Sequence, residues 1–202
     1  MKVPKSIADL IEAFEALPGI GPKTAARFVF FLTQNSEQGN QELALGIANL
    51  KRSIKQCQFC GKWHENKNSL CDICQNNSRN KELLCIVANE TDLVSIENTN
   101  LYKGFYSIFN ATSKSNNKEL KIQELKNKIK NPEKFGLSNA NFQEIILGLN
   151  PTVEGETITL YLGRELKDLN KKITRLGRGL PIGGELEYAD KETLFSAFQN
   201  RK

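Results

Sequence analysis

The sequence predicts a multidomain α+β protein with a helical N-terminal part, a cysteine cluster, an α/β domain with a mostly parallel sheet, and a turn-rich C-terminal tail that ends in a helix. Apolar residues recur at helical spacing before residue 57, and four cysteines are grouped within residues 57–74. From residue 82, short apolar runs alternate with amphipathic segments, which is typical of parallel α/β sheets. We expect four parts, at residues 1–56, 57–74, 82–176 and 177–202.

Composition restricts the broad class of protein. The chain of 202 residues allows one large domain or two to three small ones. It has no apolar run of about 20 residues, so we expect no membrane-spanning segment. The N-terminus is charged and lacks the apolar core of a secretory signal peptide, so we expect a reducing, cytoplasmic location. The formal charge is +5. Four thiolates and one Zn²⁺ would lower it to roughly +3, which does not by itself indicate nucleic-acid binding.

Two helices joined by a tight turn are predicted at the N-terminus. The first spans residues 4–17, and its apolar stripe consists of Ile7, Leu10, Ile11, Phe14 and Leu17. Pro18 and Gly19 stop this helix, and Gly21 followed by Pro22 allows a sharp turn into the second one. A third helix is expected over residues 40–56, with a stripe of Leu43, Ile47, Leu50 and Ile54.

The turn between the first two helices reads LPGIGPKTA and resembles the helix-hairpin-helix motif of DNA repair proteins, whose hairpin holds the DNA backbone without reading its sequence. The first N–H groups of a helix lack intrahelical acceptors and lie at the positive end of the helix dipole, where a phosphate can dock. Lys23 and Arg27 are four residues apart and share one face. We take Gly19, Gly21, Lys23 and Arg27 as candidate DNA-binding residues. The alternative is an ordinary helix pair whose glycines only form the turn.

Four cysteines are spaced as two Cys-x-x-Cys pairs, Cys57 with Cys60 and Cys71 with Cys74. Two such pairs supply the four thiolates of a closed tetrahedral Zn²⁺ site. No ligand position stays open for water, so we expect one structural Zn²⁺ per chain. The alternatives are two disulfides, which are rare in a reducing compartment, or a redox pair, which leaves the second pair unexplained.

Three nearby side chains have less specific interpretations. Four cysteines complete the ligand set, so Trp63 and His64 are interpreted as surface or packing residues. Cys85 lies within the apolar run Leu83–Ala88 and is interpreted as a buried, inert thiol.

The α/β domain is expected to contain strands at 83–88, 105–109, 144–149 and 172–176 and helices at 91–96 and 155–169, with an amphipathic helix through Ile122, Leu125 and Ile129. After the third strand comes Asn150-Pro-Thr-Val-Glu-Gly-Glu156, at the edge where open α/β sheets place ligands.

This loop resembles the metal-binding loop of Toprim domains, in which an Asp-x-Asp pair holds Mg²⁺ next to a Glu-Gly-Glu. Here Asn150 and Thr152 stand at the aspartate positions, although Mg²⁺ sites depend on carboxylates and water. Ala88 stands where Toprim enzymes carry a catalytic glutamate, and a methyl group transfers no proton. Phosphodiester chemistry is therefore not expected.

These motifs occur in a fixed order and are followed by a tail that reads TRLGRGLPIGGELEYAD over residues 174–190. Together they resemble the RecR family of bacterial recombination proteins over essentially the whole chain. The tail and the loop from Asn150 to Glu156 are the most specific parts. The chain departs from the family over residues 99–141, where the usual Gly- and Pro-rich segment is missing, and at Ala88, where most members keep a glutamate.

The resemblance implies a non-enzymatic DNA-binding clamp and mediator that acts in recombinational repair with RecO and RecF and loads recombinase at single-stranded gaps. It implies sequence-independent binding of single- and double-stranded DNA by a homodimer or a ring-like homotetramer. It also implies a partner-binding Toprim face, formed by Asp92, Glu154 and Glu156. The alternative function is a metal-dependent Toprim nuclease or topoisomerase-like enzyme, and a third reading is a zinc protein that only scaffolds other proteins.

Cations are concentrated where the α/β domain meets the tail: Lys167, Lys171, Lys172, Arg175 and Arg178. They are candidates for the interior of a DNA-encircling ring, which needs cations to offset phosphates. Surface solubility explains any one of them equally well.

Overall fold

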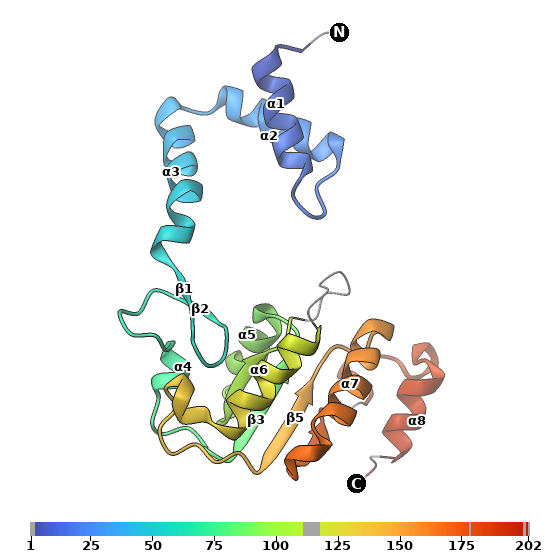
Figure 1. Cartoon of the computed structure of the whole chain (residues 1–202). Coiled ribbons are helices and arrows are strands. Elements are labelled where there is room, and N and C mark those ends of the chain that lie inside the picture. Colours follow the sequence, from blue (N-terminus) through green and yellow to red (C-terminus); the bar gives the residue numbers. More distant parts are fainter. Residues whose placement is uncertain (1–2, 111–117, 178, 200, 202) are drawn as a thin grey trace. The chain divides into compact units, whose positions relative to one another are not determined.

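The structure is a computed structural model that describes residues 3–110, 118–177, 179–199 and 201 (Figure 1). The chain forms two compact units, Met1–Ile54 and Lys55–Lys202. Within the described parts of the chain, every helix is too short or too polar to cross a bilayer.

The described part of the N-terminal unit consists of α1 (Lys5–Glu15), α2 (Pro22–Gln34) and α3 (Glu37–Ser53), so the three expected helices are present. Ala25 and Val29 of α2 are buried, and the rings of Phe14 and Phe28 lie 5.9 Å apart between α1 and α2. α3 begins three residues before its expected start, because the Ser36 side chain accepts a hydrogen bond from the backbone N–H three residues on and so caps the helix.

The apolar stripe of α3 is not covered by the rest of the described chain. Leu43, Ile47 and Leu50 are 46%, 66% and 57% exposed. Helical periodicity therefore identified the helix correctly, but this stripe is not part of a core within one chain.

The C-terminal unit begins with a small ribbon, formed by β1 (Lys55–Gln56), β2 (Trp63–His64) and α4 (Asp72–Gln75). The two strands pair antiparallel, with Gln56 opposite Trp63. Phe59 anchors the ribbon in the core, because its fully buried ring packs at 6.4 Å from the ring of Phe105 and at 5.8 Å from that of Phe142. The Ile108 N–H also donates to the Cys60 carbonyl at 2.8 Å.

The described residues of the α/β domain form one wholly parallel sheet, which confirms the expected sheet type. Its strand order is β4 (Phe105–Ile108), β3 (Leu83–Val87), β5 (Glu144–Gly148) and β6 (Lys172–Arg175). Its helical segments are α5 (Glu90–Asn98), α6 (Lys118–Lys130), η1 (Pro132–Phe135), α7 (Val153–Glu165) and η2 (Lys167–Leu169). The chain moves from β3 to β4 in one direction and from β4 to β5 and β6 in the other. Right-handed crossovers therefore place α5 on one face of the sheet and α6 and α7 on the other (Figure 1).

The described part of the tail contains η3 (Leu186–Tyr188) and α8 (Lys191–Gln199), in agreement with the expected turn-rich segment and helix. Gly183 has a φ of +83°, and the Gly184 N–H closes a turn on the Pro181 carbonyl at 3.2 Å. No described residue of α8 is buried, and Phe195 and Phe198 are 62% and 67% exposed.

Candidate functional site

The four cysteines that the sequence predicts as metal ligands come together at one point of the ribbon. All four are buried, and their Sγ atoms lie within 4.8 Å of one another. The Sγ atoms of Cys60 and Cys71 are 3.5 Å apart. With Zn–S distances of about 2.3 Å, a tetrahedral Zn²⁺ site separates its sulfur atoms by about 3.8 Å. The donor set and its size therefore fit a closed thiolate site of the zinc type.

Local backbone geometry forms the first half of this cluster. Gly61 has a φ of +83°, which lets the chain turn directly after Cys60. The Lys62 N–H then points back to Cys60 Sγ at 3.4 Å. Hydrogen bonds from the neighbouring thiols, that of Cys60 first, hold the pKa of Cys57 far below its usual range, and the same contact raises the pKa of Cys60. A bound divalent cation would supply the charge that allows all four sulfurs to be thiolates.

His64 and Cys85 take the packing roles predicted for them. His64 is 7% exposed, its Nδ1 accepts from the Asn66 N–H at 3.2 Å, and it is not part of the metal-ligand cluster. Its Nε2 is buried without a hydrogen-bond partner among the described residues. Burial raises the pKa of Cys85 to about 12, so this thiol is protonated and unreactive at neutral pH.

The four candidate DNA-binding residues lie at the turn between α1 and α2. Gly19 has a φ of +81°, and Gly21 caps α2 directly before Pro22. No side chain caps this helix. Among the described residues, no acceptor is found for the N–H groups of Gly21 and Lys23. Two backbone donors therefore remain available at the positive end of α2, as an anion-binding helix start requires.

Two cations follow these donors on α2. Lys23 and Arg27 are both exposed, and neither forms an ion pair within the part of the chain that the structure describes. The Arg27 guanidinium carbon lies 5.9 Å from the centre of the Phe28 ring, which supports the side chain from one side. The charge of both side chains is free to act on a ligand.

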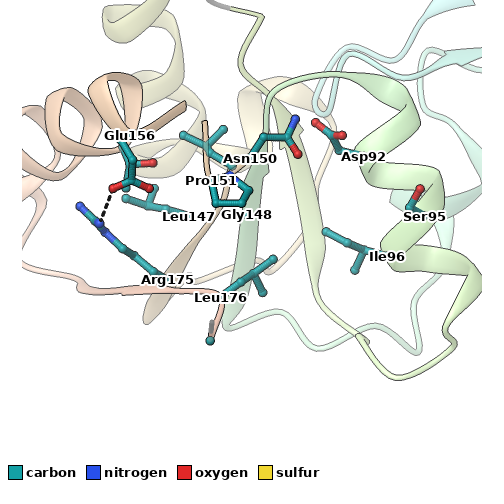
Figure 2. A pocket seen from close by; sticks show the side chains of 13 residues that line it. Asp92, Ser95, Ile96, Leu147, Gly148, Asn150, Pro151, Glu156, Arg175 and Leu176 are labelled. Carbon is teal, nitrogen blue, oxygen red and sulfur yellow. Dashed lines mark hydrogen bonds and ion pairs between the residues drawn. The ribbon is translucent and has the colours of Figure 1, made fainter. Parts of the chain in front are cut away.

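A cavity of about 300 Å³ lies beyond the carboxyl end of β5 (Figure 2). On one side, Asn150 and Asp92 point toward each other, and on the other Arg175 contacts Glu156 at 3.3 Å (Figure 2). Asp92 Oδ2 is buried and has no hydrogen-bond donor among the described residues. Apolar side chains, including Pro151 and Leu176, lie between the two polar sides (Figure 2). The cavity therefore has acidic groups at both sides, one of them already paired with a cation.

A second cavity, of about 350 Å³, is lined by Ala88, Asn150, Thr152 and Glu154. Thr152 Oγ1 accepts from the Gly155 N–H at 3.1 Å. This cap is the reason why α7 begins at Val153, two residues before its expected start. The threonine at a Toprim aspartate position is thus used to start a helix.

The glycine between the two glutamates is required by close packing. A Cβ on Gly155 would lie 2.0 Å from the Asn150 carbonyl oxygen and 3.3 Å from Thr152 Oγ1. The loop can therefore fold tightly onto the start of α7 only when this position has no side chain.

The three acidic residues predicted for one partner face line two neighbouring cavities. Asp92 and Glu156 line the first, Glu154 lines the second, and Asn150 lines both. Within the described residues, the cysteines are the one group of three or more metal-ligating side chains that come together.

Sequence reasoning missed the tertiary partners of two cations at the end of the α/β domain. Arg175 pairs with Glu156, and Lys172 pairs with Glu144 at 3.4 Å, so both proposed ring cations are partly neutralised by their own chain. The pairing of β5 with β6 places Lys172 opposite Glu144, whereas Glu156 reaches Arg175 from α7. Neither arrangement is readable from one short apolar run. Arg178, another proposed ring cation, lies outside the described residues.

The architecture defines a protein that joins a helix-hairpin-helix, a four-cysteine ribbon and a Toprim-type sheet. Three family models match the chain: "RecR, helix-hairpin-helix" over residues 7–50, "Toprim domain" over 82–177 and "RecR, C-terminal" over 179–202. The chain belongs to the RecR family.

Similar relatives carry the name "Recombination protein RecR". That of Desulfitobacterium hafniense (strain DSM 10664 / DCB-2) is 38% identical over 207 residues, which cover 100% of this chain and 98% of the relative. That of Bifidobacterium animalis subsp. lactis (strain AD011) is 39% identical over 201 residues, covering 98% and 96%. That of Staphylococcus aureus (strain Newman) is 35% identical over 205 residues, covering 100% and 98%.

Proposed function

We propose that this chain is a DNA-binding clamp and mediator of recombinational DNA repair that performs no catalysis of its own. Its relatives are named as recombination proteins, and its hairpin offers two backbone donors and two unpaired cations to a phosphate. The hairpin carries the proposal, because this arrangement recognises the sequence-independent part of DNA. The protein acts in the cytoplasm with RecO and RecF and loads recombinase at single-stranded gaps, as a homodimer or ring-like homotetramer.

The cysteine cluster holds one structural Zn²⁺ in this proposal. Four thiolates leave no position for water or substrate, so the ion has no catalytic role. The ribbon is only two short strands and one helical turn, which bury little apolar surface of their own. The metal therefore contributes folding energy and keeps the ribbon docked on the α/β domain.

The two cavities at the carboxyl edge of the sheet, which we call the Toprim cavities, are assigned to partner binding. Asp92 and Glu154 supply negative charge at the carboxyl edge of the sheet, Glu156 shares its charge with Arg175, and RecO is the partner that we assign to this face. Ala88 cannot act as an acid or base, and Asn150 and Thr152 replace the carboxylates that would hold Mg²⁺. These losses favour a binding role over a nuclease or topoisomerase. The functional parts are assigned to residues 1–56 for DNA, 57–74 for zinc, 82–176 for the partner face and 177–202 for assembly.

The test is DNA binding by fluorescence anisotropy, in Mg²⁺, for the wild type and for Lys23→Ala/Arg27→Ala. With about two phosphate contacts per chain, the slope of log K against log salt should be about −2 for one chain on duplex DNA and about −7 for a tetramer. The double variant should lose most of this slope and most of the affinity. The matched control is Lys130→Ala/Lys134→Ala, which removes the same charge from exposed positions of the other unit and should bind like the wild type.

Recovery and sizing of the DNA after binding completes the test. Intact DNA together with hairpin-dependent binding supports the mediator. Cleaved or relaxed DNA that depends on Glu154 would overturn the non-enzymatic role. Equal DNA affinity of the wild type and the hairpin variant would refute the assignment of DNA binding to the hairpin. The remaining explanations would be a protein that only scaffolds other proteins or a DNA-binding surface elsewhere on the chain.

A further inference from the structure

Trp63, the only tryptophan of the chain, is 44% exposed and lines a cavity of about 540 Å³ in the C-terminal unit. None of the four cysteines lines this cavity, although Gly61 does. It shares Asn89 and Asn110 with the cavity lined by Ala88 and Glu154 and no residue with the cavity lined by Asp92 and Glu156. Large aromatic side chains are usually buried, so an indole held open over a preformed cavity calls for an occupant.

The ribbon presents the indole together with an amide. Gln56 is the cross-strand partner of Trp63, so both side chains leave the ribbon on the same face, and both line the cavity. The backbone N–H of Trp63 donates to Glu90 Oε2 at 3.1 Å, and this hydrogen bond links the ribbon to the start of α5. The backbone of Trp63, which carries the indole, is therefore held in place before any ligand binds.

α6 also lines the cavity, and two of its lysines, Lys121 and Lys128, contribute to the lining. These two lysines differ in their ion pairs. The Lys128 ammonium pairs with Glu124 at 2.7 Å, and that charge is neutralised. The Lys121 ammonium donates to the Asn110 carbonyl at 2.5 Å and forms no ion pair with a carboxylate among the described residues. The cavity therefore offers a stacking surface, amide groups and, on Lys121, one ammonium that forms no ion pair among the described residues. It also contains the carboxylate of Glu90, which accepts from the Trp63 backbone N–H.

We propose that this cavity holds an unpaired base of a DNA single strand, stacked on Trp63, with the adjoining phosphate on Lys121. The inference rests on the proposed DNA-binding function and names the form of DNA that this part of the protein selects. Stacking on an indole tolerates any base, because every base has a π-face. The amide of Gln56 lines the cavity and can bond the base edge, and the Asn89 NH₂ group is a second donor, since the Asn89 amide oxygen already caps α5. A base inside a duplex is already stacked on both faces and cannot enter.

The single tryptophan makes the first measurement direct. The zinc-loaded full-length protein is titrated with a (dT)₂₀ oligonucleotide and with a 20-base-pair duplex while tryptophan emission is recorded. The single strand should change the emission in a saturable way at the concentrations at which anisotropy shows binding. The duplex should bind through the hairpin and leave the emission nearly unchanged.

Substitutions then test whether the contact contributes to affinity. Trp63→Ala should weaken (dT)₂₀ binding about 5- to 100-fold, as removal of one stacking platform does, and leave duplex affinity within about twofold. Trp63→Phe keeps an aromatic face and should retain most of the affinity, which separates stacking from a merely structural role. Lys121→Ala should reduce the salt slope on single strands by about 0.7. Lys130→Ala, which removes an exposed lysine outside the cavity on the same helix, should not.

The outcomes separate this inference from the proposed function. If the wild type binds (dT)₂₀ while the emission and the Trp63→Ala affinity stay unchanged, the base site is refuted and hairpin binding stands. If Trp63→Ala weakens the single strand and the duplex equally, the residue supports DNA binding in general and the selection of an unpaired base is refuted. If the wild type binds no DNA, both the inference and the proposed function fail.

Discussion

The glycine between the two glutamates of the Toprim loop allows the packing argument to be tested quantitatively. In Gly155→Ala the new Cβ would lie 2.0 Å from the Asn150 carbonyl oxygen. An ordinary contact needs about 3.5 Å, so the loop or the start of α7 must move by about 1.5 Å. The obstacle is backbone, which cannot rotate away as a flexible side chain can. We expect overpacking to cost about 1–3 kcal/mol. Disturbance of the Thr152 cap on the same N–H should cost about 1 kcal/mol more.

The control lies on the same helix. Gly163→Ala adds the same methyl group where no atom lies within 4 Å. Alanine is the better helix former, so this variant should be more stable than the wild type by about 0.5–1 kcal/mol. Urea unfolding followed by the emission of Trp63 reports on the C-terminal unit, which contains both glycines. A Gly155→Ala variant within about 0.5 kcal/mol of the wild type would refute the close approach between Asn150 and α7.

Two further predictions concern the cysteines. Cys57→Ser removes one of four thiolates, so the purified variant should contain less than one zinc per chain and should unfold at a lower temperature than the wild type; wild-type thermal stability would contradict a structural metal. Burial raises the pKa of Cys85 to about 12, so its protonated thiol contributes stability that is full below about pH 9 and is lost as pH rises toward 12. Cys85→Ala should remove this component from the pH dependence of unfolding, and an unchanged alkaline limb would refute it.

Local sequence patterns were sufficient to predict most of the secondary structure. The stripe of α1, the Gly-Pro turn before α2 and the short apolar runs of the sheet all depend on neighbours in sequence, and their periods are fixed by backbone geometry. The errors lie at helix boundaries. α3 ends at Ser53 rather than at residue 56, α7 ends at Glu165 rather than at residue 169, and both helices begin earlier than expected. Ser36 and Thr152 each accept a hydrogen bond from the backbone N–H three residues on, and these caps move α3 and α7 toward the N-terminus.

Contacts between elements that are distant in the sequence were harder to predict. The cysteine cluster was predictable because ligand spacing and metal geometry restrict it to one solution. The pairing of Arg175 with Glu156 requires knowledge of strand order, and the place of Trp63 over a cavity requires the docking of the ribbon. The three acidic residues were assigned to one partner face through the family resemblance, and in the structure Asp92 and Glu156 line one cavity while Glu154 lines the neighbouring one.

The hydrogen bond from the Ile108 N–H to the Cys60 carbonyl affects how readily the protein self-associates. β4 is one of the two outer strands of the sheet described here, and an outer strand with free N–H groups is a template for pairing with another chain. The cysteine ribbon occupies part of this border and blocks such growth. If the cysteine cluster holds Zn²⁺ as proposed, loss of the metal by oxidation or by chelation would uncover the border while the sheet itself persists. Metal-depleted protein should therefore fail by self-association into aggregates before it fails by unfolding.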